Sequence, residues 1–369
     1  MNTYEVLRRL CLSPAPSGYE KKTAEVFYSE LSKYADEVRL DKMGSVIGTF
    51  RGTDPDAPTV MVYAHMDSVG FIVRRITAEG YIQVDRLGGI PEKILPALKL
   101  SIRTRGGDFV PAIFANKAHH AASAEEKYKV DPVTSLYVDV GAYSADEVAE
   151  MDIDVGCPVV YDPAIFRLGT DKVCGTALDD RGGLAALLLA AEKLAQVRPQ
   201  CTVCIAGTVW EEFNIRGAVF AARAIKPDVA IGLDVVLAGD TPDLCGRFQN
   251  SLGNGPTVNL YNFHGRGTLN GMIPNENLVC LAEKAAKEDG IPHQRFASLG
   301  IITESAYVQM EFDGIACLDL GFPARYTHSP AEVVSISDIE NLGCLVVSML
   351  MRLNSSFPLM RYTVDQVKV

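Results

Sequence analysis

The chain has 369 residues, 48% of them hydrophobic, a formal net charge of -11 and an isoelectric point near 5.1. Its length predicts two domains, or one large domain with an insert, and its acidity excludes the cationic surface that nucleic-acid binding requires. The longest apolar runs are too short and too interrupted to span a bilayer, so no membrane association is expected. The N-terminus lacks the apolar core of a signal peptide, and the nine scattered cysteines are typical of a reducing cytoplasm, where we expect this protein.

The N-terminal part of the chain is typical of an α/β unit. We expect a short amphipathic helix at the start and a second helix over residues 17–34. There Ser17 and Glu20 have the spacing of a capping box. Apolar runs predict strands over residues 45–50 and 59–64.

The composition changes between about residue 70 and residue 167. This segment is rich in β-branched residues, with glycine and proline between them. Short strands with close turn signals predict a small β-rich domain. Its two adjacent histidines, His119 and His120, are expected to pack at a surface or an interface, because no carboxylate lies close to them in sequence.

The α/β rhythm returns from about residue 172. Helices are expected over residues 181–196, 217–225 and 275–290, and a last one from Ser337, where Glu340 repeats the capping-box spacing. Strands are expected over residues 201–210, 229–234 and 316–322. Alternating strands and helices predict a mainly parallel sheet flanked by helices, which the β-rich segment interrupts.

Polar side chains follow the strands of this predicted sheet. In open α/β sheets, ligands bind outside the carboxyl ends of the strands, so these residues should meet at one edge. They are His65 and Asp67, Asp179 and Asp180, Glu211 and Glu212, Asp234, and His328.

Each of these residues has a plain structural interpretation when it is taken alone. A histidine at a strand end is usually hydrogen-bonded, and an aspartate before a helix is usually its N-cap. Taken together, buried carboxylates and imidazoles at five strand ends would be costly without a cation. Their nitrogen and oxygen donors suit two divalent ions, zinc or else cobalt or manganese, about 3.5–4 Å apart. A glutamate left over could act as general base toward a water molecule.

Five stretches that carry these residues resemble, in order, the motifs of the di-metal tetrahedral aminopeptidases, the glutamyl-aminopeptidase family: AHMDSVGFIV, GTALDDRGG, VWEEFNIRGA, IGLDV and FPARYTHSPAEVV. The resemblance covers essentially the whole chain. It implies a catalytic domain of di-zinc exopeptidase type, residues 1–69 and 166–369, interrupted by a dimerisation domain, residues 70–165. It also implies an aminopeptidase that takes short peptides and forms homo-oligomers, dimers that often assemble into dodecamers.

The resemblance also implies a role for each residue. His65 and Asp234 would hold one metal ion, Glu212 and His328 the other, and Asp179 would bridge them. Glu211 would be the general base. Asp67 would fix the tautomer of His65. Two interpretations of Asp180 stay open. It is either a structural residue, as a helix cap or a partner of Arg181, or it helps to shape the site.

The chain departs from the family pattern near the expected cleft. Ser68 stands where the family has glutamate, Trp210 where glutamine is common, and Asn214 where it has glycine, although asparagine tolerates the left-handed conformation. The family's GGTD is GIITES here, with Thr303 and Glu304. These departures should spare metal binding and alter substrate preference.

Three alternatives stay open. The first is a di-metal N-acyl amino-acid deacylase or carboxypeptidase with the same ligands. The second is a glycosidase that uses Glu211 and Glu212, although chain neighbours are poorly arranged to flank a sugar ring. The third is a non-enzymatic assembly protein, against which the complete ligand set counts. The C-x-x-C of Cys201 and Cys204 is interpreted as two buried hydrophobic residues, because residues three apart on a strand face opposite sides.

Overall fold

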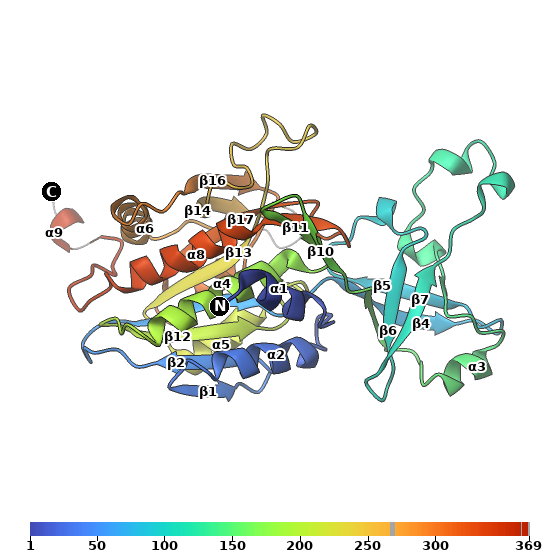
Figure 1. Cartoon of the computed structure of the whole chain (residues 1–369), viewed down its shortest axis with the longest axis horizontal. Coiled ribbons are helices and arrows are strands. Elements are labelled where there is room, and N and C mark those ends of the chain that lie inside the picture. The colour runs from blue at the N-terminus through green and yellow to red at the C-terminus, as the bar shows by residue number, and fades with distance from the viewer. Residues whose placement is uncertain (266–269, 363, 368–369) are drawn as a thin grey trace.

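The computed structural model describes residues 1–265, 270–362 and 364–367, and its strands form two separate sheets (Figure 1). The strands of the larger sheet are β1 (Glu37–Leu40), β2 (Val46–Phe50), β3 (Thr59–His65), β10 (Ile165–Leu168), β11 (Lys172–Gly175), β12 (Thr202–Thr208), β13 (Val229–Leu237), β14 (Thr257–Phe263), β15 (Gly271–Met272), β16 (Gln294–Leu299), β17 (Ala316–Arg325) and β18 (Glu332–Ser335). Nine of them follow the order β1-β2-β12-β3-β13-β17-β18-β11-β10, and β14 joins β15 and β16 to β17.

The centre of this sheet is parallel. β12, β3, β13 and β17 run in one direction, and the register pairs Thr208 with His65 and Gly232 with Tyr63. Their side chains are almost entirely buried, as is usual for parallel strands with helices on both faces. The register brings the carboxyl ends of the four strands to one edge of the sheet.

Helices cover both faces of the sheet. One face packs against α1 (Thr3–Cys11), α2 (Lys21–Leu31), α4 (Leu178–Leu194), α6 (Glu276–Glu288) and α8 (Ile336–Leu350). The other packs against α5 (Gly217–Ile225) and α7 (Ser305–Val308), and α9 (Val364–Val367) lies near the C-terminus. Gly182 lets α4 approach β17, because a Cβ there would lie 2.4 Å from the Phe322 ring. No helix among the described residues is long and apolar enough to cross a membrane.

The second sheet closes into a barrel that lies beside the larger sheet (Figure 1). Its strands are β4 (Gly70–Ile76), β5 (Ile82–Leu87), β6 (Lys99–Arg103), β7 (Phe109–Phe114), β8 (Val138–Asp139) and β9 (Pro158–Tyr161). The same segment contains α3 (Ala145–Glu150) and the 3-10 helices η1 (Glu92–Ile94), η2 (His119–Ala121), η3 (Glu126–Tyr128) and η4 (Val133–Ser135). The Phe71 ring packs edge-on against the rings of Phe114 and Tyr161 in a core of its own.

These two sheets confirm the predicted fold class, a mainly parallel α/β sheet interrupted by a β-rich unit. The exact division into residues 1–69 with 166–369 and residues 70–165 stays a prediction. His119 and His120 are exposed on the segment that projects from the barrel between β7 and β8.

Two predicted helix caps are wrong. The second helix begins at Lys21 rather than near Ser17, and neither Ser17 nor Glu20 caps it with its side chain. The last long helix begins at Ile336, because the Ser335 hydroxyl accepts the N–H of Asp338. The hydroxyls of Ser17 and Ser337 instead donate to the distant residues Asp67 and Asp171. Glu340 accepts the hydroxyl of Thr3, and Glu20 accepts the N–H groups of Gly18 and Trp210.

Candidate metal centre

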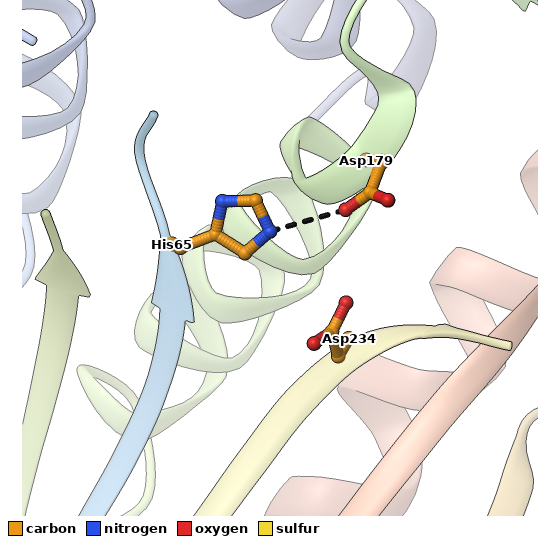
Figure 2. Close-up of side chains that lie close together, drawn as sticks. All are labelled: His65, Asp179 and Asp234. Atoms are coloured by element: carbon orange, nitrogen blue, oxygen red, sulfur yellow. Dashed lines mark hydrogen bonds and ion pairs between the residues drawn. The ribbon is translucent and has the colours of Figure 1, made fainter. Parts of the chain in front are cut away.

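His65 ends β3 and is almost fully buried, with 2% of its surface exposed. Its Nε2 lies 3.1 Å from Oδ1 of Asp179, and its Nδ1 lies 3.1 Å from the carbonyl oxygen of Asp67. Burial opposes a charged imidazole, but the carboxylates of Asp179 and Asp67 outweigh it and raise the pKa of His65 well above its ordinary value. The ring is therefore fixed with Nε2 directed to Asp179 (Figure 2).

Asp179 lies between the two histidines. It stands at the start of α4, where Asp179 and Asp180 depart from helical dihedral angles and are joined by a cis peptide bond. Its Oδ2 lies 3.5 Å from Nε2 of His328, while Oδ1 faces His65. Burial would raise the pKa of Asp179, but hydrogen bonds to the two imidazoles hold it below its ordinary value.

Asp180 combines a capping role with a contact to the site. Its Oδ1 accepts the N–H of Gly183 at 2.9 Å, and its Oδ2 accepts the N–H of His65 at 3.3 Å. Arg181 donates instead to backbone carbonyls, among them those of Leu10 and Asp67. Asp180 thus caps the regular part of α4 that follows the kink at Asp179 and Asp180, and it also holds the end of β3.

Glu211 and Glu212 lie on the turn that follows β12. Their backbone N–H groups each donate to Asp67, Glu211 to Oδ1 and Glu212 to Oδ2, both at 3.0 Å. Glu212 Oε2 lies 3.5 Å from Nε2 of His328. Burial raises the pKa of Glu212 to about 7 and that of Glu211 well above its ordinary value. The turn therefore keeps the two carboxylates close together, although two negative charges without a cation between them would repel each other.

Asp234 lies on β13, beside His65 and Asp179 (Figure 2). One ligand atom from each of these three residues lies within 4.8 Å of the other two. Burial, and then the negative charge of Asp179, raise the pKa of Asp234 well above its ordinary value. A cation between them would remove this repulsion.

His328 follows β17 on an irregular segment and has a positive φ of 63°. Its Nδ1 lies 2.5 Å from the carbonyl oxygen of Gly89, and its backbone N–H donates to Oε1 of Glu332 at 2.7 Å. Burial disfavours the charged ring, but the carboxylates of Glu212 and Asp179 raise the pKa of His328 well above its ordinary value. About a third of its side chain is exposed, so it is the more accessible of the two histidines.

The donor atoms fit divalent metal ions. Asp179, Glu212 and His328 form a second set whose ligand atoms lie within 4.8 Å of one another, and His65, Glu211 and Glu212 form a third. Imidazole nitrogen with carboxylate oxygen is a donor set that zinc, cobalt and manganese accept. Every residue that the sequence singled out as a ligand or base thus lies in one cluster.

Three supporting residues were missed by the sequence reasoning. The hydroxyl of Ser17 donates to Oδ2 of Asp67 at 2.6 Å, and Oε1 of Glu20 accepts the N–H of Trp210 at 3.3 Å. Glu332 accepts the N–H of Asp179 at 3.0 Å in addition to that of His328. The spacing of Ser17 and Glu20 predicts a capping box and so hides their contacts at the site, whereas Glu332 lies within the stretch FPARYTHSPAEVV, which carries the family resemblance.

The departures from the family pattern lie around the cluster. Trp210 and Asn214 both have positive φ, as expected for asparagine in this loop. Glu304 is buried and accepts the hydroxyl of Thr208 at 2.7 Å and the N–H of Ala218 at 2.6 Å, which ties β12 to α5 across the glutamate turn. Ser68 donates to the carbonyl oxygen of Ala15.

The cluster opens into a cavity of about 350 Å³. Asp179, Glu211, Glu212, Asp234 and His328 line it, so these site residues are accessible from one cleft. Its other lining residues include Gly89, Asn214, Ile215, Val235, Leu237, Ile301 and Ile302.

Comparison with known proteins identifies the family to which this arrangement is similar. The profile of the M42 glutamyl aminopeptidase family matches residues 44–345. The Escherichia coli (strain K12) protein SgcX is 40% identical over 96% of this chain and 95% of its own. The lysyl aminopeptidase of Pyrococcus furiosus is 32% identical over 95% of this chain and 97% of its own.

A solved structure extends the comparison to the fold. The TET1 peptidase of Pyrococcus horikoshii, whose structure reports assembly into a tetrahedron or a large octahedral shell, superposes with a TM-score of 0.84 at 27% identity. The match covers 95% of this chain and 100% of that one.

Proposed function

Since this chain belongs to the M42 glutamyl aminopeptidase family, it is an aminopeptidase, and we propose that it acts through two divalent metal ions. His65 and Asp234 would hold one ion, Glu212 and His328 the other, and Asp179 would contribute one oxygen to each. Zinc is the first choice of metal, with cobalt and manganese as alternatives.

The observation that carries this proposal is the position of Asp179 between two imidazoles. Its Oδ1 faces Nε2 of His65 at 3.1 Å, and its Oδ2 faces Nε2 of His328 at 3.5 Å. A carboxylate that offers a different oxygen to each histidine is suited to bridge two ions. The alternative of an assembly protein without activity has no support of this kind, because unused buried carboxylates would only cost stability.

Two bound ions supply polarisation of the scissile carbonyl and a water molecule of lowered pKa. The chain supplies the proton transfer. Glu211 lines the cavity and would accept a proton from the attacking water, then pass it to the amide nitrogen that leaves. Asp67 would hold both the ring of His65 and the turn of Glu211 in place.

The proposed substrates are short peptides with a free N-terminus. The carboxylates that line the cavity are the proposed metal ligands and base, which a carboxypeptidase or an N-acyl amino-acid deacylase would share. The family match and the lysyl aminopeptidase relative therefore support a substrate with a free N-terminus.

The test compares metal content with substrate choice. Wild-type protein should contain about two divalent ions per chain and should cleave leucine p-nitroanilide but not its N-acetylated form. Asp179→Ala should lose both ions and the activity, because it removes one ligand from each site. Full activity in a verified metal-free sample, or two tightly bound ions in Asp179→Ala, would contradict the proposal.

We also propose a homo-oligomer built from dimers, with a dodecamer as the expected assembly. The assembly of the Pyrococcus horikoshii TET1 peptidase supports a closed shell for this chain as well. Residues 70–165 are the proposed dimerisation unit.

A further inference from the structure

The barrel reaches into the metal centre at one point. The chain leaves β5 at Leu87 and passes the site at Gly88 and Gly89, and Gly89 lines the cavity. The carbonyl oxygen of Gly89 lies 2.5 Å from Nδ1 of His328. The hydroxyl of Tyr161, at the end of β9, donates to the backbone carbonyl of His328 at 3.2 Å. Two barrel residues therefore contact the same histidine.

The two histidines of the site share a pattern of contacts. Nδ1 of His65 faces a backbone carbonyl, that of Asp67, and its Nε2 faces Asp179. Nδ1 of His328 likewise faces a backbone carbonyl, that of Gly89, and its Nε2 also faces Asp179. A carbonyl can only accept, so Nδ1 carries a proton, and Nε2 is the nitrogen that would bind a cation once the ring is neutral.

The difference between the histidines lies in what holds the ring. His65 is fixed by burial and by a carbonyl two residues along the same segment. The His328 side chain is 33% exposed, and the partner of its Nδ1 lies 239 residues away in the barrel. Glu332 binds the backbone N–H of His328 rather than its ring, so the Gly89 carbonyl is what holds the Nδ1 side of the ring.

We propose that the barrel is a positioning element of the second metal site, in which the Gly89 carbonyl sets the orientation and tautomer of the His328 ring. Tyr161 supports it by holding the backbone of His328. This inference rests on the proposed function, since it assigns His328 to a metal ion. It means that the inserted unit completes the catalytic site within its own chain, whatever else the unit does.

Gly89→Ala is the direct test. A Cβ at this position would lie 3.3 Å from Nδ1 and 3.4 Å from Cε1 of His328, so the ring must move. Gly106→Ala is the matched control. Its Cβ would lie 3.2 Å from Oδ2 of Asp152, another side chain, and Gly106 lies between β6 and β7 outside the lining of the cavity. Tyr161→Phe is a second variant, which removes only the hydroxyl.

The measurement is the stepwise binding of Co²⁺ to the metal-free protein. The visible absorption of the bound Co²⁺ and equilibrium dialysis both monitor the binding. Gly89→Ala should weaken one of the two sites by about 10–100-fold, the usual effect of losing a partner of a metal ligand, and should leave the other unchanged. Tyr161→Phe should weaken the same site to a smaller extent. The thermal unfolding of the metal-free variants should match that of wild type.

The outcomes separate this inference from the function on which it rests. If wild type binds two ions and Gly89→Ala behaves like Gly106→Ala, the positioning role is wrong while the proposed function stands. Equal weakening of both sites also overturns it, because a general disturbance would act on both. If wild type binds fewer than two ions, the proposed function itself is wrong, and so is the assignment of His328 to a second metal ion.

Discussion

Asp67 binds the backbone of two neighbouring glutamates rather than their side chains, which leaves both carboxylates available for the proposed roles. Each of its oxygens accepts one N–H of the turn, from Glu211 and from Glu212, at 3.0 Å. The carboxylates stay near each other, with a ligand atom of each within 4.8 Å of the other, and Oε2 of Glu212 lies 3.5 Å from Nε2 of His328. Two residues adjacent in sequence can thus serve as base and as ligand.

Exchange of each glutamate for glutamine should separate the two roles. Glu211→Gln cannot accept a proton and should lose about 10²–10⁴ in kcat, as removal of a general base typically does, with metal content near wild type. Glu212→Gln should lose metal affinity, and added zinc, cobalt or manganese should restore part of its rate. Metal content and kcat of both variants, with and without added metal, check this. The reverse pattern would exchange the roles.

Asp319 should make stability depend on pH without involving the metal centre. Asp319 is fully buried on β17. Burial raises the pKa of its carboxyl group to about 6, although hydrogen bonds from Ser305, Thr303 and Asn262 lower it. The folded state therefore resists ionisation of this group, and its contribution to stability is present below pH 4 and is lost as the pH rises to 6. A shift from 3.8 to about 6 corresponds to about 3 kcal/mol.

The check is urea unfolding of Asp319→Asn beside wild type at pH 4, 5, 6 and 7. Between pH 4 and 6 the free energy of unfolding of Asp319→Asn should rise relative to that of wild type. Above pH 6 the difference between the two should stay constant. Asp56→Asn, which changes an exposed aspartate, should follow wild type throughout. Parallel curves for Asp319→Asn would mean that Asp319 is not neutralised in the fold.

At the scale of elements, the meeting of strand ends and the bounds of α5 were predictable from sequence, but two helix caps were not. His65 and Asp234 follow long apolar runs, and a parallel register brings such ends together, so their meeting required no distant information. Ser17 and Glu20 match a local cap pattern, but their side chains bind Asp67 and Trp210 instead. A local pattern cannot exclude a partner that lies many residues away.

The elements around the cavity also predict a substrate preference. Beside the carboxylates, β13 and the neighbouring loops contribute aliphatic side chains, which are Ile215, Val235, Leu237, Ile301 and Ile302. Burial of an aliphatic side chain is worth about 1.5–3 kcal/mol. The kcat/KM for leucine p-nitroanilide should therefore be tenfold or more above that for glutamate p-nitroanilide.

Ile302→Lys should narrow this ratio by attracting the glutamate side chain, whereas Val197→Lys, at an exposed valine beyond α4, should leave it unchanged. The kcat/KM values of the two anilides for each protein decide the matter. A wild type that prefers glutamate would show that the aliphatic residues do not receive the N-terminal side chain.

At the scale of the whole molecule, the barrel and the large sheet are in contact at the proposed metal centre. Gly89 and Tyr161 both contact His328, so excision of residues 70–165 would remove two supports of a proposed ligand together with the barrel. A loss of activity after excision could not then be assigned to lost assembly. The role of the barrel in assembly needs single substitutions on its outer surface.

Tyr143 and Tyr128 are suited to that purpose. They are 87% and 90% exposed in the single chain, and aromatic side chains are enriched in protein interfaces. If residues 70–165 mediate dimerisation, Tyr143→Asp with Tyr128→Asp should shift the protein toward monomer in multi-angle light scattering, since a buried unpaired carboxylate opposes association. Tyr28→Asp, at an exposed tyrosine of α2, should keep the wild-type mass. Because neither barrel tyrosine lines the cavity, metal content should stay at the wild-type value even in the monomer. An unchanged mass in the double variant would direct the search for the interface to the large sheet and its helices.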